Sequence, residues 1–217
     1  GGIRSFDETA NLLLKSTQRA RKDYTTKISG LYNDIGARIP EGTVSDGKST
    51  ANFINQYIDE AGTATGKDYV NKALFQAQKV VDDAANGKLT YARLKQFRSD
   101  TMKGIRAAES QGALGPEDAN VQKLIGHLTK DLYDLVDNAA TKMGDSKLLD
   151  DYKTINKLVK NNNAIGSDMH FINNVLKRGE ADTSAALRYA FSGAKDSGRR
   201  IRILRNQFTP EEFDVLA

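Results

Sequence analysis

Apolar side chains recur every three or four residues along most of the chain, which is the spacing of one face of an α-helix. The longest such stretch begins at Ile3, reaches Ile35 and is followed by Gly36. It predicts a helix of about 33 residues, roughly 50 Å long at 1.5 Å per residue. A helix of this length is expected to pack along several partners or a second chain.

The region from Gly87 to Gly144 predicts two long helices that form an antiparallel hairpin. Thr90 is placed to cap the first helix, and Pro116 suits the first turn of the second. The second helix carries a regular apolar seam of the kind that packs knobs into holes. Its members are Val121, Ile125, Leu128, Leu132, Leu135 and Ala139.

The remaining elements are shorter, and their character changes near Gly166. We therefore predict a long-helix bundle over residues 1–165 and a cluster of short helices over 166–217, with the packing of both into one domain as the alternative. Asp182 and Thr209 are expected to be N-caps, and Thr209 with Glu212 forms a capping box. The further helices are predicted at 50–61, 68–86, 147–161, 167–178, 182–192, 196–207 and 210–217, with a turn at 161–163.

No segment alternates apolar and polar residues with the period of two that marks a strand, so the predicted fold class is all-α. The hydrophobic fraction of 39% and the charged fraction of 28% are typical of a helical globular protein. The chain contains no cysteine, which excludes disulfides and thiolate metal sites. No apolar run approaches the roughly 20 residues of a transmembrane helix.

One stretch matches the P-loop pattern, in which glycine-rich backbone cradles phosphate, Lys reaches the terminal phosphates and Ser holds magnesium. The residues before it look like a helix end and a proline turn, whereas a P-loop follows a buried strand. The pattern therefore favours a polar loop leading into a helix capped by Ser49 or Thr50, with nucleotide binding as the alternative. The matching positions are Gly42, Gly47, Lys48 and Ser49.

Other catalytic and metal-binding patterns are weak. The two histidines, His127 and His170, lack the coordinated spacing of a metal site. No nucleophile-elbow motif supports a Ser-His-Asp triad. His127 is expected to be a partly exposed surface or interface residue. We predict no cofactor and no enzymatic activity.

Basic residues gather near the C-terminus. Residues 176–207 hold eight Lys and Arg side chains against three carboxylates, a net charge of +5, and the whole chain carries +4. Such a patch can neutralise phosphates of nucleic acid. The competing interpretation is a solvated helix face or arginines paired with acidic neighbours. The candidate nucleic-acid contacts are Arg199, Arg200, Arg202 and Arg205.

Several segments together resemble a helical pattern of large virion-associated proteins of tailed phages. They are residues 87–91 (Gly-Lys-Leu-Thr-Tyr), Leu94 with 97–99, residues 128–131 and the closing 208–213. The resemblance implies a structural or interaction segment of a longer internal or ejected virion protein. It implies a location in the virion or the host cytoplasm.

Three functions follow from these patterns. The first is a non-enzymatic segment that binds other protein chains, either virion components or a second copy. The second is a helical module that contacts nucleic acid through the C-terminal arginines. The third is nucleotide binding by Gly42 to Ser49.

Overall fold

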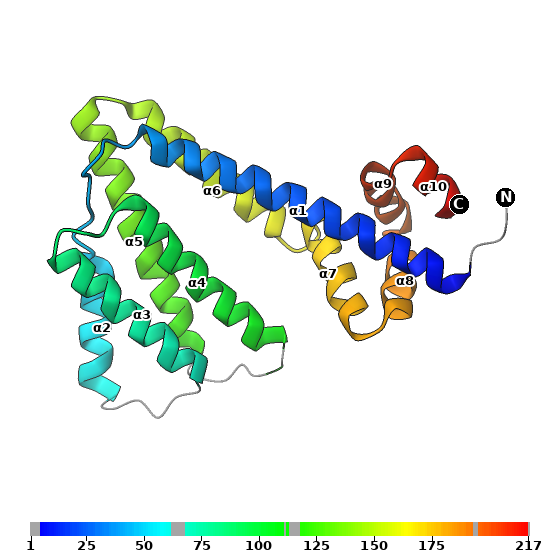
Figure 1. The fold of residues 1–217 in the computed structure, drawn as a ribbon, viewed down its shortest axis with the longest axis horizontal. Helices are drawn as coiled ribbons and strands as arrows, with labels where there is room; N and C mark the ends of the chain where they lie inside the picture. Colours follow the sequence, from blue (N-terminus) through cyan, green and yellow to red (C-terminus); the bar gives the residue numbers. More distant parts are fainter. Residues whose placement is uncertain (1–4, 62–67, 111, 113–117, 193–194, 217) are drawn as a thin grey trace. The chain divides into compact units, whose positions relative to one another are not determined.

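The computed structural model describes residues 5–61, 68–110, 112, 118–192 and 195–216. Within these residues the chain forms ten helices and a single isolated β-bridge, between Val44 and Thr90. The predicted all-α fold is therefore confirmed (Figure 1). The helices are α1 (Phe6–Arg38), α2 (Lys48–Ala61), α3 (Asp68–Ala85), α4 (Tyr91–Ser110), α5 (Asp118–Met143), α6 (Ser146–Asn163), α7 (Asp168–Ala181), α8 (Thr183–Phe191), α9 (Ser197–Gln207) and α10 (Pro210–Leu216).

The chain divides into two compact units. Unit 1 contains residues 1–32 and 153–217, and unit 2 contains residues 33–152, so α1 and α6 each contribute to both units. The sequence placed the boundary near Gly166 instead. The two divisions differ because the N-terminal part of α1, distant in sequence, supplies core residues to the short C-terminal helices.

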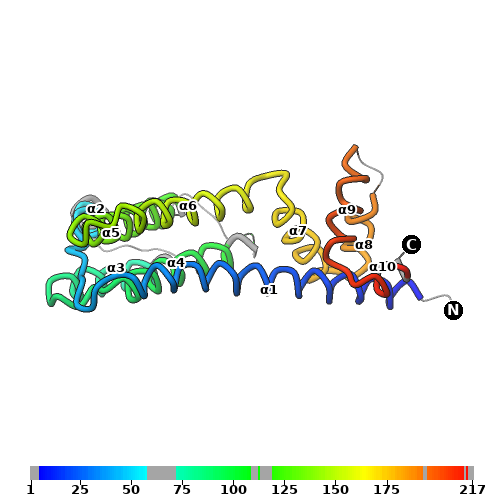
Figure 2. Tube along the Cα trace, turned by 90° about the horizontal axis from the view of Figure 1, so that it is seen from above, coloured from blue at the N-terminus to red at the C-terminus, as the bar shows by residue number. Residues whose placement is uncertain are grey.

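Unit 2 is built around α5. Helices α2, α3 and α4 each contact α5, and α4 and α5 run in opposite directions beside each other (Figure 1). Figure 2 shows α2 beside α5 from a second direction. The seam residues of α5 are buried apart from Ile125, which is half-buried. Leu124, Val136 and Ala140 are also buried, because several helices cover α5 and the apolar face is wider than one seam.

Unit 1 has its own apolar core, which joins α1 to the short helices. Ala10, Leu13 and Ala20 of α1 belong to the same buried cluster as the apolar residues of α7, α8 and α9. Helix α8 contacts both α7 and α9, and Figure 2 shows α8 and α9 side by side. The members from the C-terminal helices are Met169, Phe171, Ile172, Val175, Leu176, Ala186, Leu187, Ala190, Ile203, Leu204 and Phe208.

The predicted N-caps at Thr90, Asp182 and Thr209 are confirmed. The Thr90 hydroxyl accepts a hydrogen bond from the amide of Arg93, and the Asp182 carboxylate accepts one from the amide of Ser184 at 2.9 Å. The capping box at Thr209 is complete. The amide of Glu212 donates to the Thr209 hydroxyl, and the amide of Thr209 donates to the Glu212 carboxylate.

Some predicted helix ends are wrong by a few residues. Helix α1 continues through Gly36 to Arg38, and the missing side chain at Gly36 leaves room for the Tyr91 ring. A Cβ at Gly36 would lie 3.0 Å from that ring. Helix α6 likewise continues through residues 161–163, where a turn was predicted. The observed turn lies just after these residues. Helix α2 begins at Lys48, earlier than the predicted cap.

Candidate functional site

The P-loop-like segment packs against the connection between α3 and α4. The amide of Ser45 donates to the carbonyl of Leu89 at 2.8 Å. Gly47 adopts a φ of +57°, and a Cβ there would lie 3.0 Å from Ala84 and 3.1 Å from Leu89. Only glycine satisfies both the backbone conformation and the close packing at this position. Gly47 therefore has a structural role, because it allows the chain to turn from the loop into α2.

The N-terminus of α2 is capped by a side chain from another helix. Asp131 of α5 accepts hydrogen bonds from the amides of Ser49 at 2.9 Å and Thr50 at 2.8 Å, one on each carboxylate oxygen. Asp131 is only 2% exposed. The amide of Lys48 donates instead to Asp46, at 3.1 Å. The backbone donors that usually bind an anion at a helix N-terminus are thus already bound to carboxylates of the chain itself.

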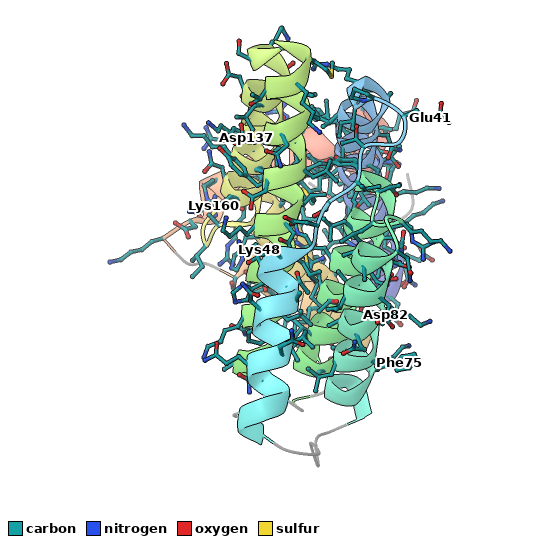
Figure 3. The ribbon with its side chains drawn as sticks, turned by 90° about the vertical axis from the view of Figure 1, so that its left-hand side faces the viewer. Glu41, Lys48, Phe75, Asp82, Asp137 and Lys160 are labelled. Carbon is teal, nitrogen blue, oxygen red and sulfur yellow. The ribbon has the colours of Figure 1, made fainter. Side chains whose placement is uncertain are left out.

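This geometry is unlike a phosphate-binding loop in three respects. The element before the loop is the helix α1, whereas a P-loop follows a strand. The Lys48 side chain is exposed at the start of α2 (Figure 3). A phosphate would have to displace the buried Asp131 carboxylate to reach the amides of Ser49 and Thr50. The loop residues Gly42 to Ser49 therefore lead into α2, and the amides of Lys48, Ser49 and Thr50 at its start are bound to carboxylates of the chain.

Ser49, His127 and Asp131 come together, but they are not connected as a catalytic triad. The Ser49 hydroxyl lies 2.7 Å from Nδ1 of His127, and the ring of Phe53 stacks on the imidazole at 4.9 Å. In a triad the carboxylate would bind and orient the histidine. Here Asp131 binds the amides of Ser49 and Thr50 instead. His127 is half-buried, which agrees with the prediction of a partly exposed residue.

The four C-terminal arginines have different environments. Arg199 donates to the carbonyl of Gly166 and lies 3.9 Å from the Asp168 carboxylate. Arg200 donates to the carbonyl of Tyr189 at 2.7 Å. These two arginines hold α9 against its neighbours and are half-buried, so they are poorly placed to contact a phosphate backbone.

Arg200 also makes cation–π contacts, with its guanidinium 4.6 Å from the Tyr189 ring centre and 5.6 Å from that of Phe171. Arg202 and Arg205 are exposed. Of the four predicted nucleic-acid contacts, only Arg202 and Arg205, in the second half of α9, are therefore accessible.

Two further kinds of feature are absent from the described residues. No helix there carries an apolar stretch long enough to cross a lipid bilayer. In the same part of the chain, no group of three or more histidine and carboxylate side chains is arranged to hold a metal ion.

The chain matches no protein-family model, no curated protein and no solved structure. Indications of function therefore come from the side chains, surfaces and charges of the chain itself.

Proposed function

We propose that the chain is a non-enzymatic helical segment that binds other protein chains within a larger, phage-derived virion protein. The observation that carries this proposal is an apolar hollow on the surface of unit 1, between the start of α1 and the end of α8. Its volume is about 610 Å³. We call it the Phe6 hollow, and its lining residues are Phe6, Thr9, Leu187, Arg188, Phe191 and Ser192.

Large aromatic side chains form the walls of the Phe6 hollow and remain open to solvent. Phe6 is 52% exposed and Phe191 is 42% exposed. The cation at the rim, Arg188, is paired with Asp182 at 3.2 Å, which leaves the hollow predominantly apolar. Adjacent exposed apolar side chains around a concavity are typical of sites that bind another protein.

The virion part of the proposal is supported by a resemblance to helical segments of tailed-phage virion proteins, carried by residues 87–91, Leu94 with 97–99, 128–131 and 208–213. The parent protein should then be a component of the assembled particle. Mass spectrometry of particles purified on a density gradient tests this directly. Absence of the chain's peptides from intact particles would contradict the virion assignment.

The Phe6 hollow can be tested in the same particles. We expect the double substitution Phe6→Ser and Phe191→Ser to reduce incorporation of the parent protein while its helical circular-dichroism spectrum is kept. Phe75→Ser is the matched control, because Phe75 is 64% exposed on α3 of unit 2 and lies outside the hollow (Figure 3). Equal incorporation of both variants would show that the hollow is not the binding surface.

A second candidate function, contact with nucleic acid, is favoured by the charges of the two units. Unit 1 contains 17 Lys and Arg residues and 10 Asp and Glu residues, a net charge of +7. Unit 2 contains 15 and 18, a net charge of −3. A polyanion would therefore be attracted to unit 1.

Salt titration of binding to a labelled DNA duplex tests this second candidate. Phosphate contacts make the affinity fall steeply with salt. In a plot of the logarithm of the binding constant against the logarithm of the salt concentration, each contact steepens the slope by about 0.9. Arg202→Gln should lower that slope, because Arg202 is exposed. Affinity that does not change with salt would exclude the function.

A further inference from the structure

A second concavity of unit 1 lies between α1 and α7 and has a volume of about 460 Å³. Its α1 residues repeat every three or four positions, so they form one stripe along that helix. We call it the α1–α7 groove. It is lined by Leu14, Gln18, Arg21, Lys22, Thr25 and Thr26 of α1 and by Leu176, Gly179 and Glu180 of α7.

At one end of the groove, Gly179 of α7 faces the Leu14 side chain of α1. A Cβ at Gly179 would lie 2.2 Å from Cδ2 of Leu14, so a larger residue at this position would force the Leu14 side chain to move. Leu14 and Leu176 give that end of the groove an apolar floor. Further along α1 the lining becomes polar, with Gln18 and two threonines. The groove therefore offers an apolar contact at one end and hydrogen-bonding groups beside it.

Two cations on the α1 side carry the charge of the groove. Arg21 and Lys22 are exposed, and neither makes an ion pair within 4.0 Å among the residues that the structure describes. Glu180, on the α7 side, is the single acidic residue of the lining. The groove thus has an excess of positive charge, inside a unit whose net charge is +7.

The same helix already binds a carboxylate a turn earlier. The Ser16 hydroxyl donates to Glu212 at 2.6 Å, and Arg19 donates to the other oxygen of the same carboxylate at 3.0 Å. Glu212 belongs to the short acidic helix α10. In this contact a hydroxyl and a guanidinium of α1 together hold an acidic side chain. Arg21 and Lys22, with the Thr26 hydroxyl, offer the same pair of functional groups, whereas the Thr25 hydroxyl donates to the carbonyl of Arg21 at 2.9 Å.

From these contacts we infer that the α1–α7 groove binds an acidic peptide segment of a partner chain. Carboxylates of the segment pair with Arg21 and Lys22, and an apolar side chain of the segment packs on Leu14 and Leu176. This inference rests on the proposed role in protein binding. It adds a second binding site to the Phe6 hollow and specifies that the partner segment is acidic. The volume of the groove lies within the range of about 300–1,000 Å³ typical of ligand sites.

The lining favours a peptide over nucleic acid. Proteins that bind single-stranded nucleic acid stack bases on aromatic rings, and the groove lining contains none. Its floor is aliphatic, and Glu180 would repel a phosphate backbone, in which every unit is charged. A peptide can place its carboxylates toward α1 and an uncharged side chain toward Glu180.

The experiment is a selection of random twelve-residue peptides against the intact chain, followed by affinity measurements by fluorescence polarisation at low salt. We expect the selected peptides to be rich in Asp, Glu and Leu. The double variant Arg21→Gln with Lys22→Gln should bind them about threefold to tenfold more weakly, as expected for partly screened ion pairs. Glu180→Gln should bind them up to about threefold more tightly, because it removes the repulsive carboxylate.

The double variant Lys157→Gln with Lys160→Gln provides the matched control, since it removes the same two charges from exposed positions of unit 1 outside the groove. Its affinity should stay within a factor of two of the parent. Peptides that bind equally to the parent and to the double variant of Arg21 and Lys22 would contradict peptide binding in the α1–α7 groove. The proposed role in protein binding would be unaffected.

Two other results would also contradict peptide binding in the α1–α7 groove. One is the recovery of no acidic peptide. Another is a single-stranded oligonucleotide that displaces the peptides and loses affinity in the same double variant. Incorporation into the particle tests the proposed function separately, because it depends on the Phe6 hollow.

Discussion

The Asp131 carboxylate stabilises the start of a helix to which it does not belong. It binds the amides of Ser49 and Thr50, which are 82 and 81 residues away in sequence. The first amides of a helix lack intrahelical partners, and burying them without an acceptor is costly. A carboxylate also interacts favourably with the positive end of the helix dipole. Asp131 thus fixes α2 against α5.

Replacing Asp131 by Ala should destabilise unit 2. One buried and one half-buried amide would lose a charged acceptor, and the loss expected from such bonds is about 2–4 kcal/mol in the free energy of unfolding. Asp131→Asn should cost less, because one acceptor oxygen remains. Urea denaturation followed by circular dichroism measures both effects.

The control for this prediction is Asp134→Ala. Asp134 pairs with Lys130 on the solvent side of the same helix, and exposed pairs contribute about 0–1 kcal/mol. Equal losses for the two alanine variants would contradict a capping role for Asp131.

Sequence reasoning succeeded for caps that are local and failed for this one. Thr90, Asp182 and Thr209 each bind an amide two or three residues later, a relation that the sequence displays directly. Asp131 is on α5 between buried leucines, and no spacing in the sequence relates it to Ser49. Its partner is determined by how α2 packs on α5. The contact between Ser49 and His127 was missed for the same reason.

At the scale of elements, α5 is the helix on which the others of unit 2 pack. Leu128 lies in the middle of its seam and is 1% exposed. The periodicity of α5 was visible in the sequence, since it depends only on spacing within one helix. The extra burial of Leu124 and Val136 was not, because it results from helices covering α5 on more than one side.

Leu128→Ala should lower the free energy of unfolding by about 2–5 kcal/mol, through lost transfer energy and the cavity left behind. Lys130→Ala should change it by less than about 1 kcal/mol, because Lys130 is exposed and forms only a surface pair with Asp134. Thermal melting of both variants measures the difference. Melting of Leu128→Ala at the parent temperature would mean that this position does not contribute to the core.

Helix α10 is connected to α1 through one acidic side chain. The Ser16 hydroxyl, followed by Arg19 and the Thr209 cap, lowers the pKa of Glu212 to about 2, against the opposing effect of burial. A carboxylate with a lowered pKa in the folded state stabilises the fold when it is ionised. Its contribution is fully present above the ordinary value of 4.5 and is lost as the pH falls toward 2.

Glu212→Gln should therefore be less stable than the parent at pH 6 and approach it in stability near pH 2. The measurement is the free energy of unfolding of both proteins at several pH values across that range. Glu211→Gln serves as the control, because Glu211 is exposed and adjacent in sequence. A constant difference between the Glu212 variant and the parent at all pH values would rule out the ionised carboxylate as the stabilising group.

At the scale of the whole molecule, the short C-terminal helices share a core with the first part of α1. The predicted boundary near Gly166 followed the change from long to short helices, which is a local property of the sequence. The observed units follow packing, which joins Ala10, Leu13 and Ala20 to residues more than 140 positions later. Contacts of that separation leave no periodic signal in either segment.

The two divisions predict different behaviour of fragments. Residues 166–217 alone would lose the apolar surface that α1 covers, so we expect them to show weak helicity and no cooperative melting. Adding a peptide of residues 5–32 should increase their helical circular dichroism in a saturable manner, because it restores the shared core. The variant peptide Leu13→Asp should not, since Leu13 is fully buried in that core. Cooperative melting of residues 166–217 without the peptide would instead support the boundary near Gly166.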